Sequence, residues 1–291
     1  MASKNIVVTG ATGNIGSRVV LELASGKQAR VTAFVRDPAK AANLTAAGAT
    51  LWKGSFENKE SLHAAFAGAD TLVLITSGEH ISEQVRDSLD AARAAGIRKV
   101  VRVSSLKAGA DGPTAATRRD GVAEGLIQAS GLTPVILRGH CFMQNILHNV
   151  ATIRGEGRIY FGTGEGKIGM IDNRDIADAA VAAALLDTWD GQTLELTGPA
   201  AIDYHAVAAA VGKALGREVT FVPVPPAAVG ATARKFGVDE DTAQLLTDYC
   251  AAYAQGWGDF TTDNVAKLTG RPARSIDDFA RDVLAPMLRA G

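Results

Sequence analysis

The stretch NIVVTGATGNIGSRVV, residues 5–20, joins a short apolar run to a helical apolar pattern through three equally spaced glycines. Gly10, Gly13 and Gly16 form the pattern G-x-x-G-x-x-G. Glycine lets a phosphate approach the main chain, and the first turn of a helix offers unpaired N–H groups with a partial positive charge. The pattern therefore predicts a phosphate cradle between a strand and a helix, and the alternative is a plain tight turn.

The same alternation continues through the first half of the chain. Further apolar runs are separated by helical stretches that end in a small residue plus glycine, such as Ser25-Gly26 and Ala47-Gly48; the runs are RVTAFV, TLVLIT, KVVRVS, PVILR and TLEL. Glycine at such points ends a helix in the left-handed conformation. Strands connected through helices run parallel. The sequence predicts an α/β fold with a doubly wound, Rossmann-type parallel sheet.

The pattern changes after about residue 140, where a glycine-rich stretch and then a mainly helical region follow. We therefore predict two domains. A nucleotide-binding Rossmann domain spans 1–150 and is completed by about 171–198. A smaller, mainly helical substrate-side domain is formed by 151–170 and 199–291.

Composition restricts the class of protein. Lys and Arg total 30 against 31 Asp and Glu, so the basic excess typical of nucleic-acid binders is absent. No apolar run is long enough for a membrane span, and the start MASKNIVVTG leaves no room for a leader before the first strand. The two cysteines and five histidines have no metal-ligand spacing. We expect a cytoplasmic protein without metal, nucleic-acid or membrane partner, and a homo-oligomer is compatible with the sequence.

The end of the second apolar run, AFVRDPAK (33–40), indicates which nucleotide is bound. An acidic residue there holds a ribose 2′-OH, whereas an arginine accommodates a 2′-phosphate. Asp37 followed by Pro38 is typical of a helix N-cap with proline in the first turn. That leaves Arg36 for the phosphate, or as an ordinary solvated charge. The sequence favours NADP(H) over NAD(H).

Five stretches (VTGATGNIG, VRDPAK, VVRVSSL, LRGHCFMQN and LTGRPARSIDDFA) resemble, in order along the chain, the NmrA-like branch of the atypical short-chain dehydrogenases/reductases. That family includes NAD(P)H-dependent quinone oxidoreductases, azo-dye and triphenylmethane reductases, and regulators that bind the nucleotide without turning it over. The resemblance implies nucleotide contacts from five loops, at Gly10, Thr12, Gly13, Asn14, Ile15, Arg36, Phe56, Thr76, Ser77, Gly78 and Ser104.

The resemblance also implies that Ser104 and Ser105 approach the nicotinamide ribose and that Phe142, Met143 and Asn145 border the nicotinamide and the substrate. Phe56 enters because many relatives carry an acidic residue where this chain has Ser55 and Phe56. Its ring would then contact the adenine.

One departure from the family affects the chemistry. Short-chain dehydrogenases generally use Tyr-x-x-x-Lys, in which lysine lowers the tyrosine pKa for proton donation. None of the four tyrosines here has a lysine four residues later, and the matching positions are Ala116 and Asp120. Ser105, His140 and Asp120 are the remaining candidates for catalysis. Each has an ordinary alternative: a strand-end hydroxyl, a packed histidine and a solvated carboxylate on an exposed helix turn.

An unactivated ketone needs an acid to stabilise the developing alkoxide, but a quinone, azo bond, imine or triarylmethyl cation is already electron-poor. We therefore predict hydride transfer from NADPH to a small conjugated acceptor. The alternative is a non-catalytic, NADP(H)-sensing regulator that acts through a protein partner. With aromatic residues at 5% of the chain, a flavin site is not expected.

Overall fold

The computed structural model describes residues 4–27 and 29–289. By their internal contacts these residues fall into two units. The first unit comprises Met1–Gly112, Ala116–Gly139 and Asn173–Glu195, and the second comprises Pro113–Ala115, His140–Asp172 and Leu196–Gly291. The function of each unit stays a prediction at this point.

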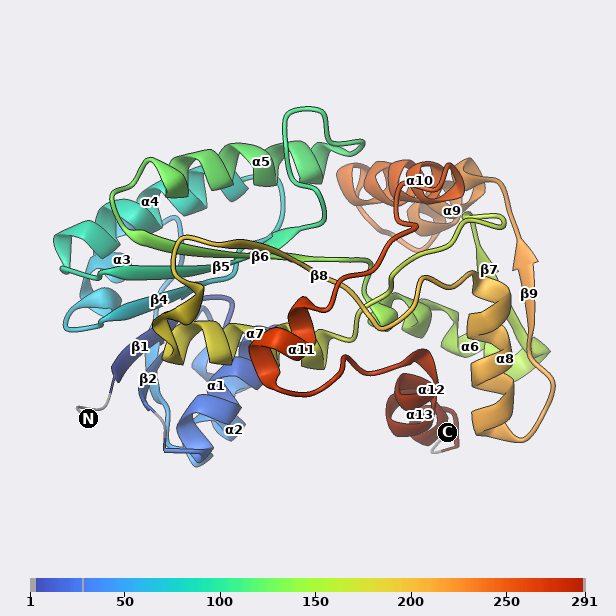
Figure 1. Ribbon diagram of the computed structural model, residues 1–291, viewed down its shortest axis with the longest axis horizontal. Helices are drawn as coiled ribbons and strands as arrows, with labels where there is room; N and C mark the ends of the chain where they lie inside the picture. The colour runs from blue at the N-terminus through green and yellow to red at the C-terminus, as the bar shows by residue number, and fades with distance from the viewer. Residues whose placement is uncertain (1–3, 28, 290–291) are drawn as a thin grey trace. The chain divides into compact units, whose positions relative to one another are not determined.

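A seven-stranded sheet runs through the first unit in the order β3-β2-β1-β4-β5-β6-β8 (Figure 1). The strands are β1 (Lys4–Val8), β2 (Ala29–Val35), β3 (Thr50–Lys53), β4 (Thr71–Leu74), β5 (Lys99–Ser105), β6 (Thr133–Gly139) and β8 (Thr193–Leu196). The pairs from β3 through to β6 are all parallel, with Ile6 of β1 opposite Val31 of β2 and Thr71 of β4. The predicted doubly wound parallel sheet is confirmed.

Helices cover both faces of this sheet, as Figure 1 shows. On one face lie α3 (Lys59–Phe66), α4 (Ile81–Ala94) and α5 (Ala115–Gln128). On the other lie α1 (Gly16–Ser25), α2 (Ala42–Ala46) and α7 (Asn173–Leu185), with the short 3-10 turns η1 (Pro38–Ala41) and η3 (Asp187–Trp189) nearby in the chain. Because both faces are covered, β4 is buried along its whole length.

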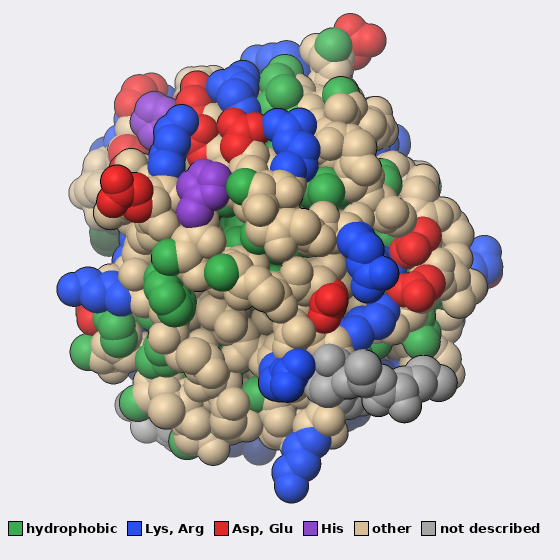
Figure 2. Space-filling model, turned by 90° about the vertical axis from the view of Figure 1, so that its left-hand side faces the viewer, with side chains coloured by type: hydrophobic (Ala, Val, Ile, Leu, Met, Phe, Trp, Pro, Cys, Tyr) green, Lys and Arg blue, Asp and Glu red, His purple; other side chains and the backbone are tan. Residues whose placement is uncertain are grey.

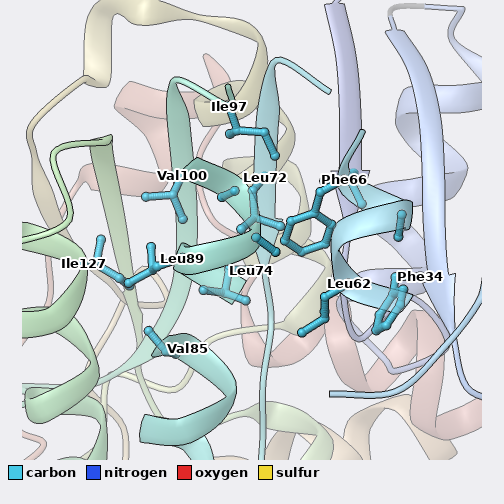
Figure 3. Close-up of a cluster of buried hydrophobic side chains, with 14 of the residues drawn as sticks. Phe34, Leu62, Phe66, Leu72, Leu74, Val85, Leu89, Ile97, Val100 and Ile127 are labelled. Carbon is cyan, nitrogen blue, oxygen red and sulfur yellow. The ribbon is translucent and has the colours of Figure 1, made fainter. Parts of the chain in front are cut away.

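One core of the first unit is drawn in Figure 3. Leu72 and Leu74 of β4 and Val100 of β5 meet side chains from α3 and α4 there, with Phe66 packed beside Leu72. All of these side chains are almost completely buried. Burial of apolar side chains contributes about 1.5–3 kcal/mol each, so this layer holds the strand ends of the sheet in place.

The second unit is mainly helical, with a two-stranded parallel sheet of β7 (Arg158–Phe161) and β9 (Thr220–Pro223). Its helices are η2 (Met143–Asn149), α6 (Val150–Glu156), α8 (Tyr204–Leu215), α9 (Pro226–Lys235), α10 (Glu240–Ala254), α11 (Asn264–Thr269), α12 (Ile276–Phe279), η4 (Ala280–Leu284, a π-helical turn) and α13 (Ala285–Arg289). Sequence analysis did not foresee β7, because its partner strand lies about 60 residues further along the chain.

Charges of both signs are intermixed on the face of the molecule drawn in Figure 2, where lysines and arginines alternate with acidic side chains. Within the described residues, no helix combines the length and the apolar character that crossing a bilayer requires.

Candidate functional site

The strand order of the first unit reverses between β1 and β4. From β1 the chain builds outward through β2 and β3, and it then returns to place β4 on the other side of β1. In open α/β sheets the ligand crevice lies at this switch point, beyond the carboxyl ends of the strands. The predicted nucleotide residues follow the carboxyl ends of β1, β2, β3 and β4 or close β5, so the fold brings them to this one edge.

Each of the three glycines in the first loop is required for a different structural reason. Gly10 has φ +59°, and a Cβ there would lie 3.0 Å from the carbonyl oxygen of Ile75. A Cβ on Gly16 would lie 2.3 Å from the carbonyl oxygen of Gly10, so only glycine lets α1 pack against the loop. A Cβ on Gly13 would meet only the Gly10 oxygen, at 3.3 Å. Gly13 therefore leaves the main chain open to an approaching group.

Two hydrogen bonds tie the start of the loop to Ile75, and the loop ends at a helix without a side-chain cap. The Thr9 hydroxyl donates to the carbonyl of Ile75 at 3.0 Å and accepts from its amide at 2.9 Å. Thr12 and Asn14 are exposed, whereas Ile15 is buried. Helix α1 has no side-chain hydrogen bond at its N-cap, Ile15. First-turn amides without a side-chain cap, beside an open glycine, suit a bound phosphate.

Arg36 directly follows β2 and is exposed. The expected N-cap is confirmed: the Asp37 carboxylate accepts from the amide of Ala39 at 3.1 Å, and Pro38 begins the turn. Sequence analysis missed a neighbouring acid, Glu57. The pKa of Glu57 is lowered, chiefly by a hydrogen bond from Ser55 and to a smaller degree by the charges of Arg36 and His80. Glu57 thus lies within electrostatic reach of Arg36.

Phe56 is half-buried beside the sheet. Its ring meets that of Phe34 edge-on, with centroids 6.0 Å apart and planes at 66°. Phe34 belongs to the core of Figure 3, so this contact anchors Phe56 while part of its ring stays accessible.

Thr76, Ser77 and Gly78 lie in the loop after β4, where Gly78 has φ +90°. Ser77 and Gly78 are exposed. The Thr76 hydroxyl oxygen is buried and has no hydrogen-bond partner in the part of the chain that the structure describes. A buried hydroxyl without a partner costs roughly 1–3 kcal/mol, which a ligand with hydrogen-bonding groups would remove.

The two serines that close β5 have different environments. Ser104 is buried, and its hydroxyl donates to the Glu124 carboxylate at 2.6 Å. The Ser105 hydroxyl oxygen is buried and without a hydrogen-bond partner in residues 4–27 and 29–289. Because β4 and β5 are neighbours, Ser105 and Thr76 both leave an unsatisfied hydroxyl at adjacent strand ends. This pair fits the polar groups of a bound nucleotide.

A charged network that sequence analysis missed adjoins Ser104 through Glu124. Arg138 donates to Glu124 at 2.6 and 3.0 Å, to Glu195 at 3.1 Å and to the carbonyl of Ala108 at 2.9 Å. The hydrogen bonds from Arg138 to Glu124 raise the arginine pKa, and burial raises the pKa of Glu195. A lone arginine within the apolar run PVILR was the sequence signal for this network, since an internal strand charge needs a partner.

Asp120 corrects one expectation, because it is not on an exposed helix turn. It is buried, and its carboxylate pairs with Arg102 of β5 at 2.8 Å. Arg102 is itself 1% exposed and also donates to the carbonyl of Leu74 at 3.3 Å. The Asp120 charge therefore pairs a buried arginine, at the position where the family has its lysine.

His140, in the second unit, has both ring nitrogens engaged. The amide of Cys141 donates to Nδ1 at 2.7 Å, so the neutral ring carries its proton on Nε2. That nitrogen donates to the carbonyl of Gly258 at 3.0 Å. His140 is 2% exposed. These contacts favour the packed-histidine alternative over proton donation.

The residues after His140 divide into buried and accessible ones. Met143 is 1% exposed, whereas Phe142 and Asn145 are half-buried. The Asn145 amide donates to the Cys141 sulfur at 3.6 Å. Burial raises the pKa of the Cys141 thiol to about 12, so it is a poor nucleophile at neutral pH.

Aromatic rings gather in the second unit although the chain contains few of them. The rings of Tyr249, Tyr253 and His140 form a near-parallel row, with 5.8 Å between successive centroids. Trp257 lies against both tyrosines, and Phe260 lies against His140. We call these five residues the aromatic cluster. Tyr249, Tyr253 and Trp257 recur every four residues, a spacing that sequence analysis did not use.

Comparison with known proteins agrees with this geometry. A family model described as NAD(P)H-binding matches residues 10–187, which contain the glycine loop and the carboxyl ends of β2, β4 and β5. The chain belongs to this NAD(P)H-binding family.

Among curated proteins, the chain is 35% identical to an NAD(P)H azoreductase of Xenophilus azovorans, covering 95% of this chain and 96% of the relative. It is 28% identical to quinone oxidoreductase 2 of Escherichia coli K12, covering 93% and 96%. The crystal structure of that quinone oxidoreductase with NADPH superposes with a TM-score of 0.85, covering 94% of this chain and 98% of the other. The predicted class, an NAD(P)H-dependent oxidoreductase resembling the NmrA-like proteins, is confirmed.

Proposed function

We propose that the protein is an NADPH-dependent reductase that passes hydride to an electron-poor conjugated acceptor of the quinone, azo, imine or triarylmethane type. The observation that carries the proposal is the end-to-end similarity to an NAD(P)H azoreductase. In this proposal the first unit binds the nucleotide and the second provides acceptor contacts.

The first unit offers a partner for each part of the nucleotide. The amides of Asn14 and Ile15 and the open face of Gly13 would hold the pyrophosphate. Arg36 would pair with a 2′-phosphate, which is the basis for preferring NADPH to NADH. Phe56 would pack on the adenine, and the unsatisfied hydroxyls of Thr76 and Ser105 would hydrogen-bond the nicotinamide half. Bound NADPH supplies the hydride.

Among the described residues the site offers no strong proton donor, and this favours acceptors that need little acid assistance. Asp120 neutralises Arg102, and both nitrogens of His140 are engaged. The Ser105 hydroxyl is the candidate hydrogen-bond donor to the acceptor, and it is a weak acid. Acceptors that are electron-poor before they bind need little acid assistance, so positioning does most of the work. Phe142 and Asn145 are the accessible candidates for contact with them.

The two cysteines indicate the cellular compartment. Cys141 and Cys250 are buried free thiols, as expected for a protein kept in a reducing compartment such as the cytoplasm. No flavin or metal takes part in the proposed reaction.

The test is oxidation of NADPH, followed by its absorbance, against quinones, azo dyes, triarylmethane dyes, imines and simple ketones. Binding of NADPH is measured in parallel by calorimetry, and Gly13→Val is the matched control that lacks the cradle. We expect turnover with at least one electron-poor class and none with ketones. Tight NADPH binding without oxidation of any acceptor would contradict the proposal and support the NADP(H)-sensing alternative.

A further inference from the structure

The second unit contains a cavity beside the aromatic cluster. It has a volume of about 460 Å³ and is lined by Pro113, Asp248, Ala251, Ala252, Gln255, Gly256 and Trp257. Sites for small molecules have volumes of this order, with mostly apolar walls and a few polar groups. Every lining residue belongs to the second unit, so the cavity exists within that unit alone.

One side of α10 (Figure 1) forms the floor of the cavity. Asp248, Ala251 and Ala252 of α10 and its C-cap residue Gln255 follow the spacing i, i+3, i+4, i+7, which places them on one side of the helix. The two alanines leave a shallow apolar surface between the polar side chains at the ends. A shallow floor of this kind suits a flat aromatic ring.

Trp257 forms the aromatic wall and is firmly supported. Its ring centroid lies 5.6 Å from that of Tyr253 and 6.3 Å from that of Tyr249. Gly258 lets this packing close, because a Cβ there would lie 2.7 Å from the Tyr253 ring and 2.8 Å from His140. The indole is therefore fixed before a ligand arrives, and a flat ring placed on it would extend an existing stack.

The charge at the other end of the cavity is a carboxylate. Asp248 accepts a hydrogen bond from the Gln244 amide at 2.8 Å, which fixes its orientation. No lysine, arginine or histidine pairs with Asp248 directly in the chain as far as it is described. Arg234, which donates to the Gln244 amide oxygen at 3.5 Å, is paired with Glu240. The negative charge of Asp248 is thus left for a positively charged ligand, which an indole face also attracts.

We propose that this cavity is a binding subsite for aromatic cations, one ring of which stacks on Trp257 while the positive charge lies beside Asp248. The subsite rests on the proposed function for its role, since there it would select cationic members of the conjugated acceptor class. Binding itself needs neither NADPH nor turnover.

The experiment compares two dyes that share one aromatic framework. Basic fuchsin is a triarylmethane cation, and acid fuchsin is its sulfonated, anionic form. Dissociation constants are measured by equilibrium dialysis with the full-length protein and no NADPH. We expect basic fuchsin to bind at least about fivefold more tightly than acid fuchsin, because Asp248 attracts one and repels the other. Equal affinity, or preference for the anion, would overturn the proposal.

Variants locate the binding. Trp257→Leu should weaken basic fuchsin about tenfold, and Trp257→Phe, which keeps a ring, should lose less. Asp248→Asn keeps an oxygen for Gln244 and should weaken the cation about fivefold. Asp259→Asn is the matched control, since Asp259 is an exposed carboxylate outside the cavity, and it should change the affinity less than twofold. Equal losses in Asp248→Asn and Asp259→Asn would reduce the effect to net charge and overturn the subsite.

The two proposals fail separately. NADPH-dependent reduction of a quinone without any binding of basic fuchsin would overturn the subsite and leave the proposed function intact. Dye binding that depends on Trp257 and Asp248, without oxidation of NADPH by any acceptor, would support the subsite and contradict the reductase.

Discussion

The nucleotide edge of the first unit and the aromatic cluster of the second are built in opposite ways. The nucleotide edge consists of loops at successive strand ends, supported by the buried ion pair Arg102–Asp120 and the partly buried ion pair Arg138–Glu124. The aromatic cluster is held by ring contacts and by the close packing that Gly258 allows. The nucleotide edge offers hydrogen-bond donors and charge to a ligand, whereas the aromatic cluster offers the faces of packed rings.

This difference determines how each region tolerates change. Removal of one partner of a buried ion pair lowers the free energy of unfolding by several kcal/mol, because the other charge stays buried without its partner. A ring in a stack can be exchanged for another ring at smaller cost. We therefore expect substitutions at the nucleotide edge to separate sharply into those that affect folding and those that affect binding. The following predictions test that separation.

Gly13→Val should abolish NADPH binding, with a loss of more than about 100-fold, because the added side chain fills the open face of the loop. The melting temperature should stay close to that of the parent protein. Gly16→Val gives the contrast, since its Cβ would clash with the Gly10 oxygen, and it should lower the melting temperature strongly. Calorimetric titration and thermal unfolding distinguish the two, and unchanged affinity in Gly13→Val would refute the cradle.

Asp120→Asn should destabilise the fold by about 3 kcal/mol, since it leaves Arg102 buried without its counter-charge. Turnover per folded molecule should stay nearly constant with a quinone acceptor. Denaturant unfolding measures the first effect, and kcat normalised to the folded fraction measures the second. A large loss of kcat in fully folded protein would show that Asp120 acts in catalysis.

Arg36→Ala should weaken NADPH by about 30-fold and leave NADH within about twofold, because only NADPH has the 2′-phosphate. Lys40→Ala, at another exposed cation one turn further on, is the control and should have a smaller effect. Parallel titrations with both nucleotides provide the measurement. Equal losses for NADPH and NADH would remove Arg36 from the 2′-phosphate site.

Ser104→Ala should mainly lower the stability of the fold, whereas Ser105→Ala should mainly lower the activity. Ser104→Ala removes a hydrogen bond to the buried Glu124 carboxylate and should cost about 1.5–3 kcal/mol of stability. Ser105→Ala removes an unsatisfied hydroxyl, so stability should hold or rise while kcat/KM falls about tenfold. Unfolding curves and steady-state kinetics are measured on both, and the opposite assignment would exclude Ser105 from the site.

Glu57→Gln should strengthen NADPH binding by about twofold, because it removes a negative charge near the proposed 2′-phosphate position. The effect should shrink at high salt and be absent for NADH. The sign alone decides this prediction, so a weaker affinity for NADPH would mean that Glu57 does not face the phosphate.

Features that depend on local interactions could be predicted from the sequence. Gly10, Gly13, Gly16 and the Asp37-Pro38 cap were readable because each acts on main chain within a few positions of itself. The same locality made the strand–helix alternation visible and with it the parallel sheet. Arg36 stays a prediction for the 2′-phosphate, and its support is its position at the end of the second strand.

Other features depend on partners far along the chain. Asp120 was a candidate for catalysis, with a solvated carboxylate as the alternative, and only the fold places it against Arg102, 18 residues away. The sequence does not distinguish Ser104 from Ser105. In the fold, Glu124 lies within hydrogen-bond distance of the Ser104 hydroxyl and leaves that of Ser105 without a partner among the described residues. The aromatic cluster joins His140 to a residue 118 positions further on through the carbonyl of Gly258.

The sequence by itself therefore determined the parallel α/β fold and the glycine loop, since short-range steric and hydrogen-bonding preferences encode both. Only the tertiary structure decided which of the candidate polar side chains are satisfied and which are left for a ligand. Satisfaction depends on what packs opposite a side chain, and residues distant in sequence supply those partners.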